Sequence, residues 1–205
     1  MQYTLDLAKI PLDAYLALLK RQTLPPSRRM LTEDADGKFA RIRAQGVASV
    51  AQLLKALSTP AKREAFAKQS GVDGEYLTVL RREAGTFKRK PVKLSAFPHT
   101  DKAKLDALAG RGILTSEDCF ERGDAHSRLY ALSDLTRING IGPNAAAMFY
   151  EAGYRSVTGI ANADAGALLA RVTDVNQDHR YYAGNLGEKD MQFCIDYAKM
   201  IGSLC

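Results

Sequence analysis

The chain contains 205 residues, of which 46% are hydrophobic and 25% are charged, and its formal net charge is +6. This composition is typical of an ordinary soluble globular protein. No apolar run approaches the roughly 20 residues that a membrane-spanning helix needs, and no secretory leader pattern opens the sequence. We therefore expect a cytoplasmic protein with no membrane partner.

The positive charge is concentrated in the first half of the chain. Residues 1–100 hold 18 Lys and Arg against 9 Asp and Glu, whereas residues 101–205 hold 11 against 14. A basic surface attracts polyanions such as nucleic acid. The sequence places that surface before residue 100.

In chain order, apolar residues recur at helical spacing almost throughout. The clearest examples lie at 12–19, 50–57, 76–80 and 191–198. Because runs of alternating β-branched residues are absent, this spacing predicts an all-α fold. Glycine, proline and charge combine at 85–95 (GTFKRKPVKLS), which favours a linker between a basic helical unit, 1–86, and a second unit, 97–205. We also expect an irregular stretch at 173–187 before a last helix at about 189–201.

A helix-glycine pattern occurs three times. In each copy an amphipathic helix runs into a glycine (Gly46, Gly112 and Gly153), followed by an apolar residue and then by Ser or Thr. Glycine in the left-handed conformation commonly ends a helix, and Ser or Thr is a preferred N-cap of the next one. The irregular spacing indicates diverged, duplicated units rather than a strict solenoid.

A basic segment overlaps the predicted linker and contains only Glu83 as a counter-charge. Its members are Arg81, Arg82, Lys88, Arg89, Lys90 and Lys93. Such a run could neutralise several phosphates and make binding salt-dependent. The alternative is a solvated linker that only keeps the chain in solution.

The segment 135–154, LTRINGIGPNAAAMFYEAGY, predicts two helices joined by a glycine turn. Ile141 would anchor the turn to both helices, and Pro143 suits the first turn of the second helix. The amides of Gly140, Gly142, Asn144 and Ala145 could then hold one phosphate. Arg137 and Arg155 are the candidate electrostatic helpers. Alternatively, the two glycines only let the helices cross closely.

This string resembles the GIG hairpin of the helix-hairpin-helix superfamily. The resemblance implies tandem hairpins and binding of the nucleic-acid backbone without reading of sequence. It also implies that hairpin carbonyls can hold a monovalent cation, and it puts Asn144 where Lys or Arg is common. The longer pattern is similar to an uncharacterised bacterial and archaeal family of unknown function, most strongly over 135–170.

No catalytic constellation is apparent. The three histidines are widely separated, and the three cysteines (Cys119, Cys194 and Cys205) show no metal-ligand spacing. Asp164 fits a helix cap better than a catalytic acid, and Cys119 fits a core position. Tyr181 and Tyr182 could stack on a base or cover the last helix. We expect no enzyme activity, no cofactor and no metal.

The sequence therefore predicts a non-catalytic protein that binds the nucleic-acid backbone independently of sequence, DNA in preference to RNA. The alternative is a protein-interaction or scaffold module whose hairpins are structural only. The basic first half favours the first hypothesis, and the acidic hairpin half favours the second.

Overall fold

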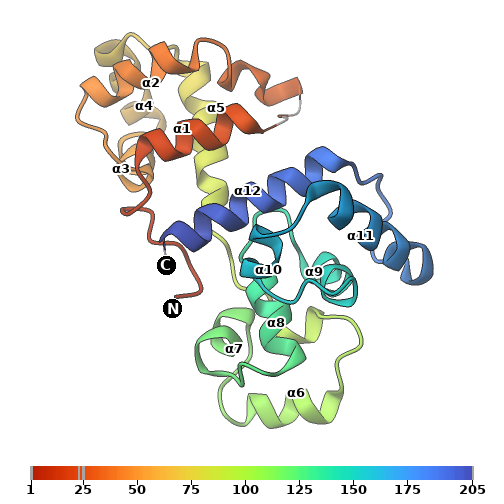
Figure 1. Ribbon diagram of the computed structural model, residues 1–205. Coiled ribbons are helices and arrows are strands. Elements are labelled where there is room, and N and C mark those ends of the chain that lie inside the picture. Colours follow the sequence, from red (N-terminus) through yellow and green to blue (C-terminus); the bar gives the residue numbers. More distant parts are fainter. Residues whose placement is uncertain (1, 23, 25, 205) are drawn as a thin grey trace. The chain divides into compact units, whose positions relative to one another are not determined.

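The computed structural model describes residues 2–22, 24 and 26–204 (Figure 1). These residues form helices and no strand; only two isolated β-bridges occur among them, Pro11 with Ser49 and Lys93 with Thr115. The all-α prediction is confirmed. No helix in this part of the chain is long and apolar enough to cross a membrane.

The described chain divides into two compact units. Residues 5–88 form one unit, and residues 2–4 together with 89–203 form the other. The second unit thus includes residues 2–4 and the segment at 89–96. The expected domain limits of 1–86 and 97–205 stay a prediction.

The first unit consists of α-helices and short 3-10 helices around an aromatic core. The rings of Phe39 and Phe87 lie 6.1 and 5.3 Å from the ring of the buried Tyr15. The elements are α1 (Leu12–Arg21), η1 (Pro26–Leu31), α2 (Ala35–Ala44), α3 (Val50–Ala56), α4 (Pro60–Ser70), α5 (Gly74–Ala84) and η2 (Gly85–Phe87).

The second unit contains the segment that resembles a helix-hairpin-helix protein. Its elements are η3 (Leu94–Ala96), α6 (Lys102–Ala109), α7 (Ser116–Arg122), α8 (Arg128–Leu135), α9 (Pro143–Glu151), α10 (Val157–Ala161), α11 (Ala165–His179) and α12 (Glu188–Leu204). Helices α8 and α9 form the predicted hairpin, and α10 and α11 follow as a second helix pair.

The three helix-glycine units are present as predicted. Gly46, Gly112 and Gly153 have φ of +80°, +71° and +92°, each just beyond the end of α2, α6 or α9. The side chains of Ser49, Thr115 and Ser156 then accept a hydrogen bond from the backbone at the start of α3, α7 or α10. The repeat therefore rests on glycine stops and hydroxyl caps.

The two segments expected to be irregular are partly helical. The segment at 85–95 is not solvated throughout, because it contains η2 and the start of η3, which bury Phe87 and Leu94. The boundary between the two units, after Lys88, falls within this segment. The segment at 173–187 is not irregular throughout, because α11 continues to His179. The part of α11 beyond residue 173 holds no glycine or proline that would stop it.

Candidate functional site

The turn between α8 and α9 is closed around two buried isoleucines. Ile138 and Ile141 are 0% and 1% exposed, and the Ile141 amide donates to the Ile138 carbonyl at 3.2 Å. Ile141 thus anchors the turn, as expected from its place between two glycines. Pro143 is the first residue of α9, where a missing N–H leaves no hydrogen bond unmade.

The two glycines of the turn serve different purposes. Gly140 has a φ of +90°, a conformation that other residues adopt only with strain. Gly142 has a φ of −91° and an extended backbone that any residue can adopt. A Cβ added at Gly142 would meet nothing within 4 Å. Gly142 therefore leaves open space at the start of α9.

Backbone donors gather at that open space. The amides of Gly142, Asn144 and Ala145 donate no hydrogen bond to any described residue, and Asn144 is exposed. The helix dipole places partial positive charge at the same point. Amides with no internal partner at a helix start are the usual donors to a phosphate or another anion.

Arg137 is not an electrostatic helper on this surface. It is 3% exposed and pairs with the buried Asp134 at 2.8 Å. Its Nε donates to the carbonyl of Tyr3 at 3.2 Å, and its guanidinium lies 4.5 Å from the centre of the Phe120 ring. The guanidinium therefore stabilises the unit from inside.

Arg155 lies beyond the opposite end of α9 from the Asn144 and Ala145 amides. It follows the C-terminal end of that helix, and eight residues at 1.5 Å each separate the two ends by about 12 Å. Its guanidinium lies 5.0 Å from the centre of the Tyr150 ring. That it assists the hairpin amides electrostatically stays a prediction.

Arg89 also differs from its predicted role as a surface charge. It is half-buried, and its guanidinium donates to the hairpin carbonyls of Thr136 and Ile141. The nearby cations Lys88 and Lys90 are exposed. Arg89 therefore belongs to the interior of the hairpin.

The rest of the basic segment is available to solvent. Arg81 and Arg82 are exposed on α5, as are Lys88 and Lys90 beyond it. Glu83, the expected counter-charge, is buried and pairs with Arg28 at 2.5 Å. Its charge is matched inside the first unit and does not offset the exposed cations.

Sequence reasoning missed Asp134, which ties the hairpin to the next helix pair. One carboxylate oxygen pairs with Arg137, and the other accepts the Val157 amide at 2.8 Å. That amide is the first of α10. The i, i+3 spacing of Asp134 and Arg137 was the available signal, because it puts both on one face of a helical turn.

The residues considered for catalysis occupy structural positions. Asp164 caps α11 by accepting the Ala167 amide at 2.9 Å, as predicted. Burial raises the pKa of the Cys119 thiol, and that of Cys194 to about 12, so neither is a thiolate at neutral pH. Cys205 lies outside the described residues. The described chain shows no cluster of three or more potential metal ligands.

Tyr181 and Tyr182 have separate environments. The Tyr181 hydroxyl donates to Glu151 at 2.8 Å, and burial together with this carboxylate raises the pKa of the tyrosine to about 12. Tyr182 is 45% exposed and lines a cavity of about 170 Å³ beside Gly140 and Phe193. Of the two tyrosines, Tyr182 has the ring more open to stacking on a base.

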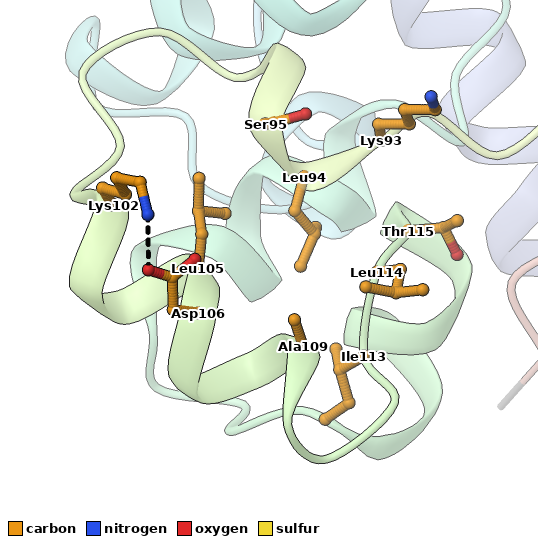
Figure 2. Close-up of a pocket in the computed structure, with 10 residues that line it drawn as sticks. All are labelled: Lys93, Leu94, Ser95, Lys102, Leu105, Asp106, Ala109, Ile113, Leu114 and Thr115. Carbon is orange, nitrogen blue, oxygen red and sulfur yellow. Dashed lines mark hydrogen bonds and ion pairs between the residues drawn. The ribbon is translucent and has the colours of Figure 1, made fainter.

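A larger groove lies elsewhere in the second unit. It lies between α6 and the segments around Leu94 and Leu114 (Figure 2). Its volume is about 630 Å³. Leu114 is 57% exposed, and the charged pair at the rim, Lys102 and Asp106, is joined at 2.7 Å. The groove exposes mostly apolar surface, and the polar side chains of Lys93, Ser95 and Thr115 also line it.

Comparison with known families supports the interpretation of the hairpin. Residues 132–178 match the family described as SAM-like helix-hairpin-helix tandem. The match begins within α8 and ends near the end of α11, so this segment is similar to a helix-hairpin-helix tandem. No curated protein and no solved structure matches the chain. The narrower likeness to an uncharacterised bacterial and archaeal family stays a prediction.

Proposed function

We propose that this protein binds the nucleic-acid backbone without catalysis and without reading sequence, DNA in preference to RNA. The observation that carries the proposal is the group of three unpaired amides at the start of α9. They lie in a segment similar to a helix-hairpin-helix tandem, a class of domain that commonly binds nucleic acid. A phosphate oxygen fits such donors because they supply hydrogen bonds and partial positive charge together.

The hairpin alone offers one phosphate contact, and the exposed cations supply further charge. Arg81, Arg82, Lys88 and Lys90 can each neutralise a phosphate and release its counter-ions. Neither component recognises a base edge, and contacts to phosphates position a protein without carrying sequence information. The expected activity is therefore independent of sequence and sensitive to salt.

Asn144→Asp tests the hairpin directly. A carboxylate in the first turn of α9 favours the helix dipole, so the fold is kept or slightly stabilised, whereas a phosphate at the same amides is repelled. Fluorescence anisotropy with a labelled duplex should show weaker binding. Gln177→Glu is the matched control, because it makes the same change of charge on α11, outside the first turn of α9.

The proposal fails if Asn144→Asp and Gln177→Glu bind the duplex as tightly as the unaltered chain. The same titration with single-stranded DNA and with RNA tests the preference for duplex DNA. Equal or tighter binding of RNA would contradict that part of the proposal.

A second candidate function is protein interaction, and the groove beside α6 favours it. No residue of α6 is buried, and the exposed Leu114 lies at the groove. An apolar groove with an exposed leucine is a feature of protein-binding surfaces. If no polynucleotide binds at low salt, this scaffold function replaces the first.

A further inference from the structure

The guanidinium of Arg89 contacts the hairpin at the end of α8 and again just before α9. Nη2 of Arg89 donates to the carbonyl oxygens of Thr136 and Ile141 at 3.2 and 3.1 Å, and Nε donates to Thr136 at 3.3 Å. Nη1 reaches the side-chain oxygen of Asn139 at 3.4 Å. Thr136 is the C-cap of α8, and Ile141 lies just before α9. Arg89 therefore bridges the turn from one helix to the other.

These carbonyls need a donor, and a cationic one suits them. Thr136 and Ile141 are each 1% exposed, so water has little access to their backbone. Unpaired carbonyls in buried backbone are costly. At the C-terminal end of α8, the Thr136 carbonyl also carries the negative end of the helix dipole. A cation that faces both carbonyls satisfies both requirements together.

The helix-hairpin-helix resemblance implies a monovalent metal ion on hairpin carbonyls, and the residues present do not fit one here. The Thr136 oxygen already accepts two N–H groups, and the Ile141 oxygen accepts one. A metal ion on the same oxygens would lie about 4 Å from the guanidinium, where like charges repel strongly. The two cations exclude one another.

We infer that the Arg89 guanidinium is the built-in cation of this hairpin, holding the carbonyls of Thr136 and Ile141 in place of a metal ion. Arg89 is a positioning residue: it fixes the turn from which the α9 amides emerge. It follows that the geometry of the hairpin does not depend on which monovalent cation is in solution. This property goes beyond the proposed binding function and is measured without nucleic acid.

Amide hydrogen exchange of the full chain tests the inference in two salts of equal ionic strength, potassium chloride and tetramethylammonium chloride. Tetramethylammonium is too large to be bound by hairpin carbonyls. The reporter is the Ile141 amide, which closes the turn. The variant is Arg89→Met, and Lys90→Met is the matched control that removes a neighbouring exposed charge.

In the unaltered chain the Ile141 amide should exchange equally slowly in both salts. In Arg89→Met it should exchange at least about tenfold faster in tetramethylammonium, because charge-assisted hydrogen bonds are lost. Potassium should restore part of that protection by occupying the freed carbonyls. Lys90→Met should behave like the unaltered chain. A merely structural arginine would not produce a dependence on cation identity.

Three results would overturn the inference. The first is that the Ile141 amide of the unaltered chain exchanges more slowly in potassium than in tetramethylammonium. The second is that this amide exchanges at the same rate in Arg89→Met and Lys90→Met. The third is that it exchanges faster in Arg89→Met and that potassium does not slow it. Arg89→Lys keeps the charge and serves if the methionine variant does not fold. It should show faster exchange than the unaltered chain in both salts alike, and a dependence on potassium in this variant would overturn the inference.

Discussion

At the scale of single residues, the two glycines of the hairpin carry different constraints. Gly140 adopts a φ of +90°, whereas Gly142 has an ordinary extended backbone beside open space. The first glycine is therefore required by the fold, and the second is required only if a ligand approaches the backbone closely. Substitutions at the two glycines can therefore test the stability of the hairpin separately from its proposed binding role.

Gly140→Ala should lower the free energy of unfolding by about 1 kcal/mol or more, because alanine is strained at this φ. Gly142→Ala should change it by no more than about 0.5 kcal/mol, since its new methyl group meets no atom. Urea unfolding of the two variants measures both effects. Equal destabilisation by the two alanine substitutions would contradict the conclusion that only Gly140 is required by the fold.

Arg137 should behave as a structural residue. Arg137→Met leaves the carboxylate of Asp134 buried without its ionic partner, and breaking a buried pair in this way costs about 3–5 kcal/mol. Arg155→Met removes only a guanidinium beside Tyr150 and should cost about 1 kcal/mol or less. Thermal unfolding compares the two. Similar melting temperatures would show that the Asp134 pair does not stabilise the unit.

At the scale of elements, the helix-glycine units explain what could be predicted from the sequence. Glycine, a following apolar residue and a hydroxyl cap are local signals, so Gly46, Gly112 and Gly153 mark three helix ends in the residue pattern alone. The GIG turn and the cap at Asp164 are local in the same way. Helix type and order were therefore accessible from the sequence.

The partners of the two arginines could not be predicted, because they are distant in sequence. Arg137 donates to a carbonyl 134 residues away, at Tyr3, and Arg89 donates to acceptors 47 and 52 residues away. Charge alone suggested that both face solvent. Tertiary packing instead places Arg137 beside Asp134 and Arg89 beside the hairpin carbonyls. No local sequence pattern predicts these positions.

The N-terminal cap of α7 should make the stability of the protein depend on pH. Thr115 and Asp118 form a capping box, and the hydroxyl of Thr115, with further donors, lowers the pKa of Asp118 to about 2. Because the folded pKa lies below the value of about 3.9 in an unfolded chain, this carboxylate stabilises the fold at higher pH. That contribution is lost as the pH falls from about 4 toward 2.

Asp118→Asn should therefore destabilise the chain at pH 6 and have much less effect at pH 2, since the window of about 2 to 4 separates the two conditions. Thr115→Ala should also make the free energy of unfolding depend less on pH, since it removes the largest cause of the lowered pKa of Asp118. Urea unfolding at both pH values measures this. If the free energies of unfolding of Asp118→Asn and the unaltered chain differ by the same amount at pH 6 and pH 2, this prediction is wrong.

At the scale of the whole molecule, the exposed cations and the hairpin are expected to contribute unequally to binding. The hairpin amides offer one phosphate contact, whereas Arg81, Arg82, Lys88 and Lys90 offer several charges. Neutralisation of phosphates dominates binding that is independent of sequence. The cations should therefore supply most of the affinity, and the hairpin should fix the position of one phosphate.

Replacing Arg81, Arg82, Lys88 and Lys90 by glutamine should weaken binding for all sequences alike. The slope of log affinity against log salt should flatten by about 0.9 for each duplex phosphate contact that is lost. Anisotropy titrations over a range of salt concentrations give that slope. Asn144→Asp should cost less affinity than the fourfold variant. The reverse order would make the hairpin the main source of affinity.

The most direct test of backbone binding at the start of α9 is an amide chemical-shift titration of the full chain with a short DNA duplex at low salt. We predict saturable shifts of the Gly142, Asn144 and Ala145 amides that weaken as salt is added. Those amides should shift together, and the buried Ile138 amide should change less. Binding of the duplex with no shift at these three amides would show that the start of α9 is not the binding site.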